Sequence, residues 1–158
     1  VVIEGIALNN TAEYLNTASS WQIYVQAESP DKGGIAAWKS AGKEVDKLES
    51  ISAQEFATRM KGTKLTVFDV RKQGEWDAEH LENAQFASLQ FLNDHIAEFS
   101  KSEPNYIHCA GGYRSMIAAS MLKSRGYHNV VEIAGGFNAI KQTDLATTAF
   151  VCPSTLKK

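Results

Sequence analysis

The segment HCAGGYRS, residues 108–115, combines a thiol, two glycines and an arginine within a few positions. Cys109 follows an apolar run that is typical of a strand, and a run typical of a helix begins after the turn. Glycines let successive backbone N–H groups point at one position, and a helix N-terminus adds partial positive charge there. We therefore expect the pKa of the thiol to fall from ~8.5 to between ~3.5 and ~7.5. The pattern predicts that Cys109 is a nucleophilic thiolate at neutral pH.

The residues after Cys109 form the predicted anion-binding loop. We expect their backbone N–H groups to surround a group bound at the sulfur. Arg114 is expected either to orient an anionic substrate or to brace the loop, and Tyr113 either to contact substrate or to be an ordinary exposed tyrosine. The alternative for Cys109 is an inert cysteine, since free cysteines are often simply buried. The predicted substrate-binding residues are Ala110, Gly111, Gly112, Tyr113, Arg114 and Ser115.

The residue spacing around Cys109 distinguishes between several reactions that a reactive cysteine can perform. Phosphatases built on a cysteine loop use C-x5-R, but here the arginine comes one residue earlier, which favours a smaller anion such as the sulfur of a persulfide. Disulfide exchange needs C-x-x-C, whereas Gly112 stands three residues after Cys109. The two cysteines are 43 residues apart and no histidine pair has the spacing of helical ligands, so we predict no metal site. A cysteine hydrolase would need a base, and the candidates are His80, His95, His108 and His128. His108 is adjacent to Cys109 in a strand, so we expect its side chain to point to the opposite face.

The composition limits which class of protein the chain can be and which partners it is expected to bind. The chain has 158 residues, 44% hydrophobic and 22% charged, with a net charge of −2 and no basic block. These values predict a globular domain and give no reason to expect nucleic acid or an anionic membrane as a partner. No apolar run approaches the ~20 residues of a membrane helix. Two cysteines suit a reducing compartment, so we expect a cytoplasmic location, although a chain that begins Val-Val looks cut from a longer one.

Helical and strand-like segments alternate after residue 50. Ser52 and Glu55 form a capping box, S-x-x-E, which predicts a helix start. Gly126 stands where a helix C-cap is expected. This alternation predicts an α/β fold with a parallel sheet that helices cover on both faces. The expected helices span 53–60, 75–80, 91–99, 114–125 and 136–141, and the expected strands span 64–70, 85–87, 106–109 and 130–133.

A partial repeat precedes this region. GGIAAWK at 33–39 matches GGFNAIK at 135–141, and at the same offset of 102 residues Ala7 falls on Cys109. A spacing near 100 residues indicates duplication of a domain, with a chance match beside a strand as the alternative. Because a half-domain exposes a sheet edge, we expect it to pack on the complete domain or to form a homodimer. The predicted parts are an inactive C-terminal half-repeat at 1–45, a linker at 46–50, an active domain at 51–146 and a tail at 147–158.

Three motifs resemble those of rhodanese-type sulfurtransferases. HCAGGYRS resembles their active-site loop, and FDVRKQGEWDAEHLENAQ at 68–85 resembles a motif in the first half of their domain. VVEIAGGFNAI at 130–140 resembles their closing strand and helix. The motifs occur in the family's order and cover about residues 50–145. The sequence departs from the family pattern at Glu79, Asn83 and Ile140, where the family has glycine, glycine and tryptophan.

This resemblance implies a rhodanese-like sheet of five parallel strands with helices on both faces, and a ping-pong reaction without a cofactor. Cys109 would take sulfane sulfur from a donor, become a persulfide and pass the sulfur to a thiol or cyanide. The implied partners are small sulfur-containing anions and thiols, and the candidate donors are thiosulfate, glutathione persulfide, polysulfide and a protein persulfide. In relatives a rhodanese pair can follow a metallo-β-lactamase-like persulfide dioxygenase domain, which implies such a domain upstream of this chain.

Two other functions stay open from the sequence. A non-enzymatic rhodanese-like binding module would recruit a partner and needs no reactive cysteine. An arsenate reductase would use Cys109 to attack arsenate and requires a second thiol, for which Cys152 is the candidate. An inert, packed cysteine is the alternative for Cys152.

Four further residues belong to the rhodanese-like motif before the loop. Asp69 and Arg71 stand where a strand ends, which is the edge at which α/β proteins form their sites. We expect them to support the cysteine loop through ion pairs or hydrogen bonds, with shaping of the pocket as the alternative. Glu75 and His80 are expected to be structural, with His80 holding a backbone group.

Overall fold

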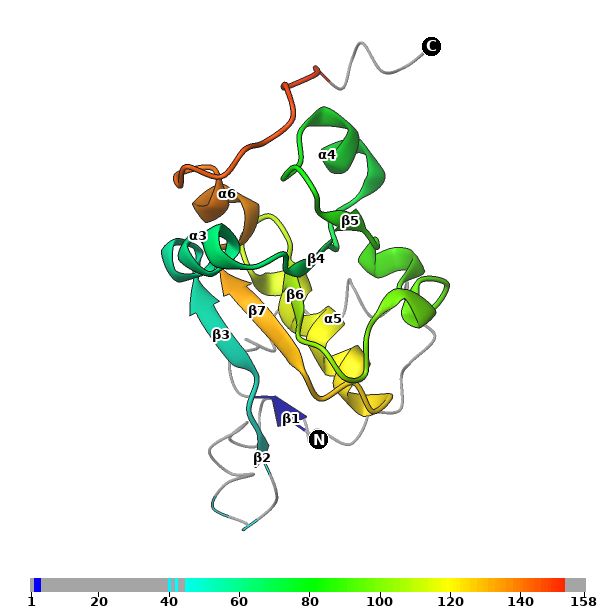
Figure 1. The fold of residues 1–158 in the computed structure, drawn as a ribbon. Helices are drawn as coiled ribbons and strands as arrows, with labels where there is room; N and C mark the ends of the chain where they lie inside the picture. The colour runs from blue at the N-terminus through cyan, green and yellow to red at the C-terminus, as the bar shows by residue number, and fades with distance from the viewer. Residues whose placement is uncertain (1, 4–39, 41, 43–44, 153–158) are drawn as a thin grey trace. The chain divides into compact units, whose positions relative to one another are not determined.

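The computed structural model describes residues 2–3, 40, 42 and 45–152 (Figure 1). The chain divides into two compact units, Val1–Leu48 and Glu49–Lys158. In the first unit β1 (Val2–Ile3) pairs in parallel with β2 (Val45–Asp46). The half-repeat expected at 1–45 lies almost entirely outside the described residues, so it stays a prediction.

A five-stranded parallel sheet forms the centre of the second unit. Its strands are β3 (Glu49–Ser52), β4 (Thr66–Asp69), β5 (Gln85–Phe86), β6 (Asn105–His108) and β7 (Val130–Ala134). They lie in the order β3-β7-β6-β4-β5, and every neighbouring pair is parallel. The sheet and its helices confirm the α/β fold expected from the sequence.

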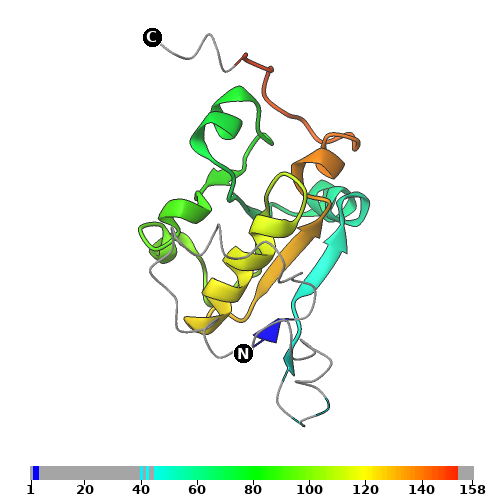
Figure 2. The same cartoon turned by 180° about the vertical axis from the view of Figure 1, so that it is seen from behind.

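Helices cover both faces of this sheet. On one face, α3 (Ala53–Gly62) and α6 (Gly136–Ile140) pack on alternate side chains of β3 and β7. The other face is covered by α5 (Tyr113–Ser124), which lies behind the strands in Figure 1 and in front of them in Figure 2. The short α4 (Gln73–Ala78) follows β4. Because all five strands run in the same direction, the loops after β4, β6 and β7 meet at one edge.

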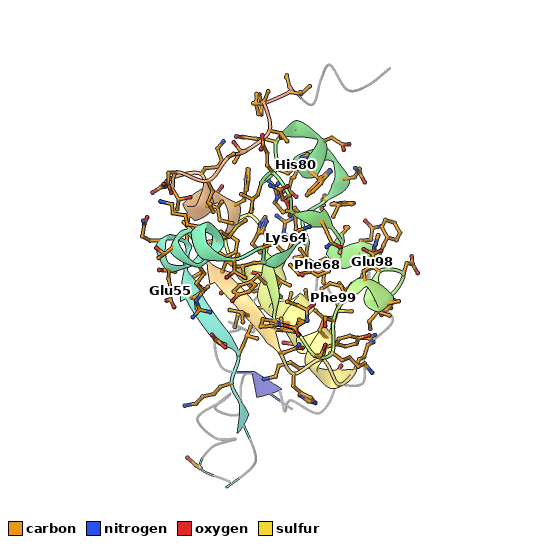
Figure 3. The ribbon with its side chains drawn as sticks, viewed as in Figure 1. Glu55, Lys64, Phe68, His80, Glu98 and Phe99 are labelled. Atoms are coloured by element: carbon orange, nitrogen blue, oxygen red, sulfur yellow. The ribbon has the colours of Figure 1, made fainter. Side chains whose placement is uncertain are left out.

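The core consists of aliphatic and aromatic side chains on the two faces. Ile51, Val131 and Ile133 pack with Phe56 of α3 in the cluster on the α3 and α6 face. Phe68 is fully buried, and its ring stacks on the ring of Phe99 with centroids 3.9 Å apart (Figure 3). Burial of a large side chain of this kind stabilises a fold by roughly 1.5–3 kcal/mol relative to exposure.

Most expected elements occur within two residues of their expected bounds. The capping box is present, since the Ser52 hydroxyl accepts a hydrogen bond from the Glu55 N–H at 3.1 Å. The helix expected at 91–99 is wrong: two 3₁₀ turns occur instead, Leu89–Phe91 and Ile96–Glu98. Two poor helix formers, Asn and Asp, stand between these turns.

The linker expected at 46–50 overlaps two strands. Glu49 and Ser50 belong to β3, and Ser50 pairs in register with Glu132 of β7. The sequence of β3, ESIS, offers one large apolar residue, so nothing in the local pattern indicates a strand. Its partner strand is about 80 residues away in the chain, and only the folded sheet brings the two together.

The residues that depart from the family pattern each have a local explanation. Asn83 has a positive φ of 67°, a conformation that glycine adopts freely and asparagine tolerates better than most residues. Glu79 accepts hydrogen bonds from Lys141 at 2.6 Å and from Thr147 at 3.1 Å, which attaches the start of the tail to the end of α4. Ile140 is fully buried in the core.

Candidate active site

Cys109 stands directly after β6, at the sheet edge where the strands end. The chain then turns through residues 110–112 and enters α5 at Tyr113. Gly112 is the N-cap of this 12-residue helix and has a φ of +104°, so a side chain at this position would strain the turn. The strand-to-helix turn predicted from the sequence is therefore present, and Cys109 lies at the positive end of the helix dipole.

Two hydrogen-bond donors contact the sulfur of Cys109. The Gly112 backbone N–H lies 3.1 Å from Sγ, and the Ser115 hydroxyl oxygen lies 3.6 Å from it. Cys109 is buried, with 1% of its surface exposed. Donors held at a sulfur that water barely reaches stabilise negative charge there, because their interaction is stronger in a low dielectric than in water. The arrangement can hold a thiolate or a persulfide anion.

The start of α6 holds the backbone of the cysteine loop in place. The Phe137 N–H donates to the Cys109 carbonyl at 2.6 Å, and the Asn138 N–H donates to the Ala110 carbonyl at 3.0 Å. Gly136 makes this approach feasible: it has a φ of +56°, and a Cβ atom there would overlap the Cys109 carbonyl oxygen. These contacts occupy two loop carbonyls on the α6 side of the loop.

Arg114 is part of an ion pair that braces the loop. Its guanidinium lies 2.5 Å and 2.8 Å from the two carboxylate oxygens of Glu75 in α4. The hydrogen bond from Arg114 lowers the pKa of Glu75 below its ordinary value. Glu75 also accepts from the Lys72 N–H at 3.1 Å, so the same carboxylate caps α4. Of the two roles open for Arg114, the geometry favours bracing of the loop.

Asp69 and Arg71 form a buried ion pair beneath this edge. Arg71 Nε lies 2.9 Å and 2.8 Å from the two oxygens of Asp69, and 0% and 5% of the Asp69 and Arg71 surfaces are exposed. Arg71 also donates to the Glu79 carbonyl at 2.7 Å and lies 4.0 Å from the centre of the Phe137 ring. The pair therefore joins β4 to the end of α4 and to α6.

The structure places His108 in the core rather than at the sulfur. Its ring is fully buried and lies near Phe137, with centroids 6.0 Å apart. Nδ1 lies 4.0 Å from Asp69, whereas Nε2 has no hydrogen-bond partner among the described residues. Burial lowers the pKa of His108, and this effect exceeds the opposing effect of Asp69. Burial therefore favours the neutral form of His108 in the folded protein.

His108 predicts a pH dependence of stability. Between its unfolded pKa of about 6.5 and its lower pKa in the folded protein, His108 binds more proton in the unfolded chain than in the folded chain. The free energy of unfolding should therefore fall as the pH drops through this range, with a contribution of up to ~1.4 kcal/mol per pH unit. Urea unfolding of the native protein and of His108→Phe between about pH 5.5 and 7.5 measures the contribution of His108 to this pH dependence. His128→Gln, at an exposed histidine, is the control. A slope that survives in His108→Phe would contradict the prediction.

Glu132 is a site residue that the sequence analysis missed. It lies in β7, is 3% exposed, and its two carboxylate oxygens contact the hydroxyls of Ser115 at 3.0 Å and Ser50 at 2.6 Å. Burial raises the pKa of Glu132, although both hydroxyls act in the opposite direction. A glutamate inside an otherwise apolar strand, VVEIA, was the available signal, but its partner could not be read from the sequence.

The other residues singled out in the sequence are His80, Tyr113 and Cys152. His80 follows α4 (Figure 3). Its ring stacks on Trp76, and its Nδ1 lies 2.8 Å from the Trp76 carbonyl. Tyr113 begins α5 and is partly buried. Cys152 is exposed in the tail, whereas Cys109 is buried.

In the described part of the chain no group of three metal-ligating side chains gathers. None of the helices described there is long and apolar enough to span a bilayer.

The fold and the site define a parallel α/β domain with a cysteine-centred loop at the strand edge. The family model described as the rhodanese-like domain matches residues 52–143, and the chain belongs to this family. The match covers the sheet from the end of β3 through α6, together with the whole cysteine loop.

Curated relatives differ in the activity that their names state. A tRNA uridine(34) hydroxylase of Chlamydia abortus is 30% identical over 100 residues, which cover 58% of this chain and 31% of that protein. A thiosulfate sulfurtransferase of Coxiella burnetii is 29% identical over 93 residues, which cover 59% of this chain and 87% of that protein. The chain thus spans less than a third of the hydroxylase and most of the sulfurtransferase.

Solved structures show the same architecture. A crystal structure of a rhodanese-like domain protein from Staphylococcus aureus has a TM-score of 0.58 and 29% identity, and the likeness covers 63% of this chain and 97% of that one. A solution structure of a rhodanese-like domain from Anabaena has a TM-score of 0.59 and 23% identity, with coverage of 64% and 79%. The second likeness supports the fold alone.

Proposed function

We propose that this domain is a sulfurtransferase in which Cys109 carries sulfane sulfur as a persulfide. The observation that carries the proposal is the environment of Sγ, where the Gly112 N–H and the Ser115 hydroxyl converge at the N-terminus of α5. A catalyst of this type needs a site that stabilises a sulfur anion before and after transfer. The name of the Coxiella burnetii relative supports thiosulfate as the first donor to try.

The proposed reaction is a double displacement at sulfur. The Cys109 thiolate attacks the outer sulfur of thiosulfate, a new S–S bond forms, and the old S–S bond breaks with its electron pair leaving on sulfite. A thiolate or cyanide acceptor then attacks the outer sulfur of the persulfide. The S–S bond to Cys109 breaks, and the electron pair returns to the Cys109 thiolate. Small sulfur-containing anions and thiols are therefore the proposed partners, and the chemistry requires no metal or organic cofactor.

Intact-mass analysis after brief exposure to thiosulfate or to glutathione persulfide tests the proposal. We expect a mass gain of one sulfur atom on the native chain, lost again on addition of cyanide or a thiol, and no gain on Cys109→Ser. Cys152→Ser is the matched control, because it removes the exposed thiol and keeps the loop. The donor that loads faster identifies the donor class.

Two outcomes would redirect the proposal. Absence of sulfur loading from either donor, with Cys109 alkylated readily at neutral pH, would point to a binding module. Consumption of arsenate that requires both Cys109 and Cys152 would point to an arsenate reductase instead.

A further inference from the structure

Ser115 Oγ contacts three hydrogen-bond acceptors but carries one hydrogen. It lies 3.6 Å from Cys109 Sγ, 2.8 Å from the Gly112 carbonyl oxygen and 3.0 Å from Glu132 Oε1. A hydroxyl donates one hydrogen and accepts through its lone pairs. The Gly112 carbonyl already accepts from the Met116 N–H at 3.2 Å, so the Ser115 hydrogen is available for Cys109 or Glu132. The other of these two contacts is satisfied when that group carries a second proton and points it at Ser115.

We propose that Glu132 is a positioning residue for Cys109 and that the two groups share one proton through the Ser115 hydroxyl. In one arrangement the thiol proton points at Ser115 Oγ, and Ser115 donates to the Glu132 carboxylate. In the other, protonated Glu132 donates to Ser115 Oγ, and Ser115 donates to the Cys109 thiolate. Conversion moves one proton from S to O and another from O to O; no electron is transferred and no other bond changes.

The surroundings of Glu132 favour a single shared proton. Ser50 from β3 lies 2.6 Å from the second carboxylate oxygen, and Ile107 of β6 is the register partner of Glu132. On the α5 side, the Glu132 carboxylate contacts the Ser115 hydroxyl. In the part of the chain that the structure describes, these neighbours carry hydroxyl or apolar groups, and Cys109 is the titratable group next to them.

Burial and like charge both disfavour simultaneous ionisation of Glu132 and Cys109. A carboxylate and a thiolate that are both buried and joined by one hydroxyl repel each other, which disfavours the doubly ionised state. Burial also raises the pKa of Glu132, which favours its protonated form. Two groups coupled in this way lose their protons in two steps that belong to the pair. The inference rests on the proposed function only in that Cys109 must be the reacting thiol.

The test is the pH profile of Cys109 alkylation by iodoacetamide, between about pH 5 and 10, with the label located by peptide mapping. For the native chain we expect the rate to rise in two steps. For Glu132→Gln we expect one step, at a midpoint lower than the upper native step by about one pH unit or more. Glu49→Gln is the matched control: it removes an exposed carboxylate from the same sheet and should leave the native profile unchanged.

A second variant keeps the test decisive if Glu132→Gln fails to fold. Ser115→Ala removes the hydroxyl that carries the proton and keeps the carboxylate, so one step should remain near the upper native midpoint. A native profile with one step that Glu132→Gln does not move would overturn the proposal and leave Glu132 as a bridge between Ser50 and Ser115. Alkylation needs no sulfur donor. A two-step profile without sulfur loading would therefore refute the proposed function and not this inference.

Discussion

Gly136→Ala is expected to lower the free energy of unfolding by about 2–5 kcal/mol and to abolish sulfur loading of Cys109. Gly136 has a φ of +56°, which costs a residue with a Cβ atom about 1–2 kcal/mol. The added Cβ would also overlap the Cys109 carbonyl oxygen and lie 2.8 Å from the carbonyl carbon and oxygen of Ala110. Backbone atoms cannot rotate away as side chains do, so the loop itself must move.

The expected loss of function follows from the hydrogen bonds beside Gly136. The N–H groups of Phe137 and Asn138 hold the carbonyls of Cys109 and Ala110, and a displaced α6 would release them. The donors around the sulfur would then lose their geometry. Urea unfolding, intact-mass sulfur loading and Cys109 alkylation measure the two effects together.

The matched control is Gly62→Ala, at the last residue of α3. A Cβ at Gly62 meets no atom within 4 Å, and alanine is a better helix former than glycine. This variant should be neutral or more stable by up to about 1 kcal/mol, with native sulfur loading. A Gly136→Ala protein with native stability and native loading would show that the contact between α6 and the loop is unimportant.

Asp69→Asn is expected to destabilise the protein by about 3–5 kcal/mol, because it leaves the buried Arg71 guanidinium without its counter-charge. Asparagine keeps the shape of the side chain and an oxygen that can accept from the Arg71 backbone N–H, a contact of 3.0 Å in the native chain. The variant therefore isolates the lost charge. Because Arg71 also holds the Glu79 carbonyl, we expect α4 and its Glu75–Arg114 ion pair to loosen as well.

The control for the charge effect is Glu55→Gln. Glu55 pairs with Arg59 at 2.7 Å, as Asp69 pairs with Arg71, but its side chain is 50% exposed. A solvated pair of this kind contributes little, so Glu55→Gln should cost less than about 0.5 kcal/mol. Unfolding by urea at pH 7 compares the two variants. Equal costs for Asp69→Asn and Glu55→Gln would contradict the role assigned to the buried pair.

The sequence was sufficient to predict those elements whose pattern lies within a few neighbouring residues. The capping box at Ser52 places the start of α3, and short strand-like runs place β4, β6 and β7, because strand composition acts over a few residues. The strand, glycine turn and helix around Cys109 are local in the same sense. Periodicity at 91–99 was misleading, because spacing of apolar residues does not show whether the intervening residues sustain a helix.

By itself, then, the sequence determined the α/β class, the cysteine loop and the family to which the domain belongs. Only the tertiary structure decided the role of Arg114, which meets Glu75 from 39 positions away, and the presence of Glu132 behind Ser115. The same is true of β3, whose pairing with β7 no local pattern reports. The physical reason is that these contacts depend on the order and register of parallel strands. Those are set by packing between distant segments rather than by the preferences of neighbouring residues.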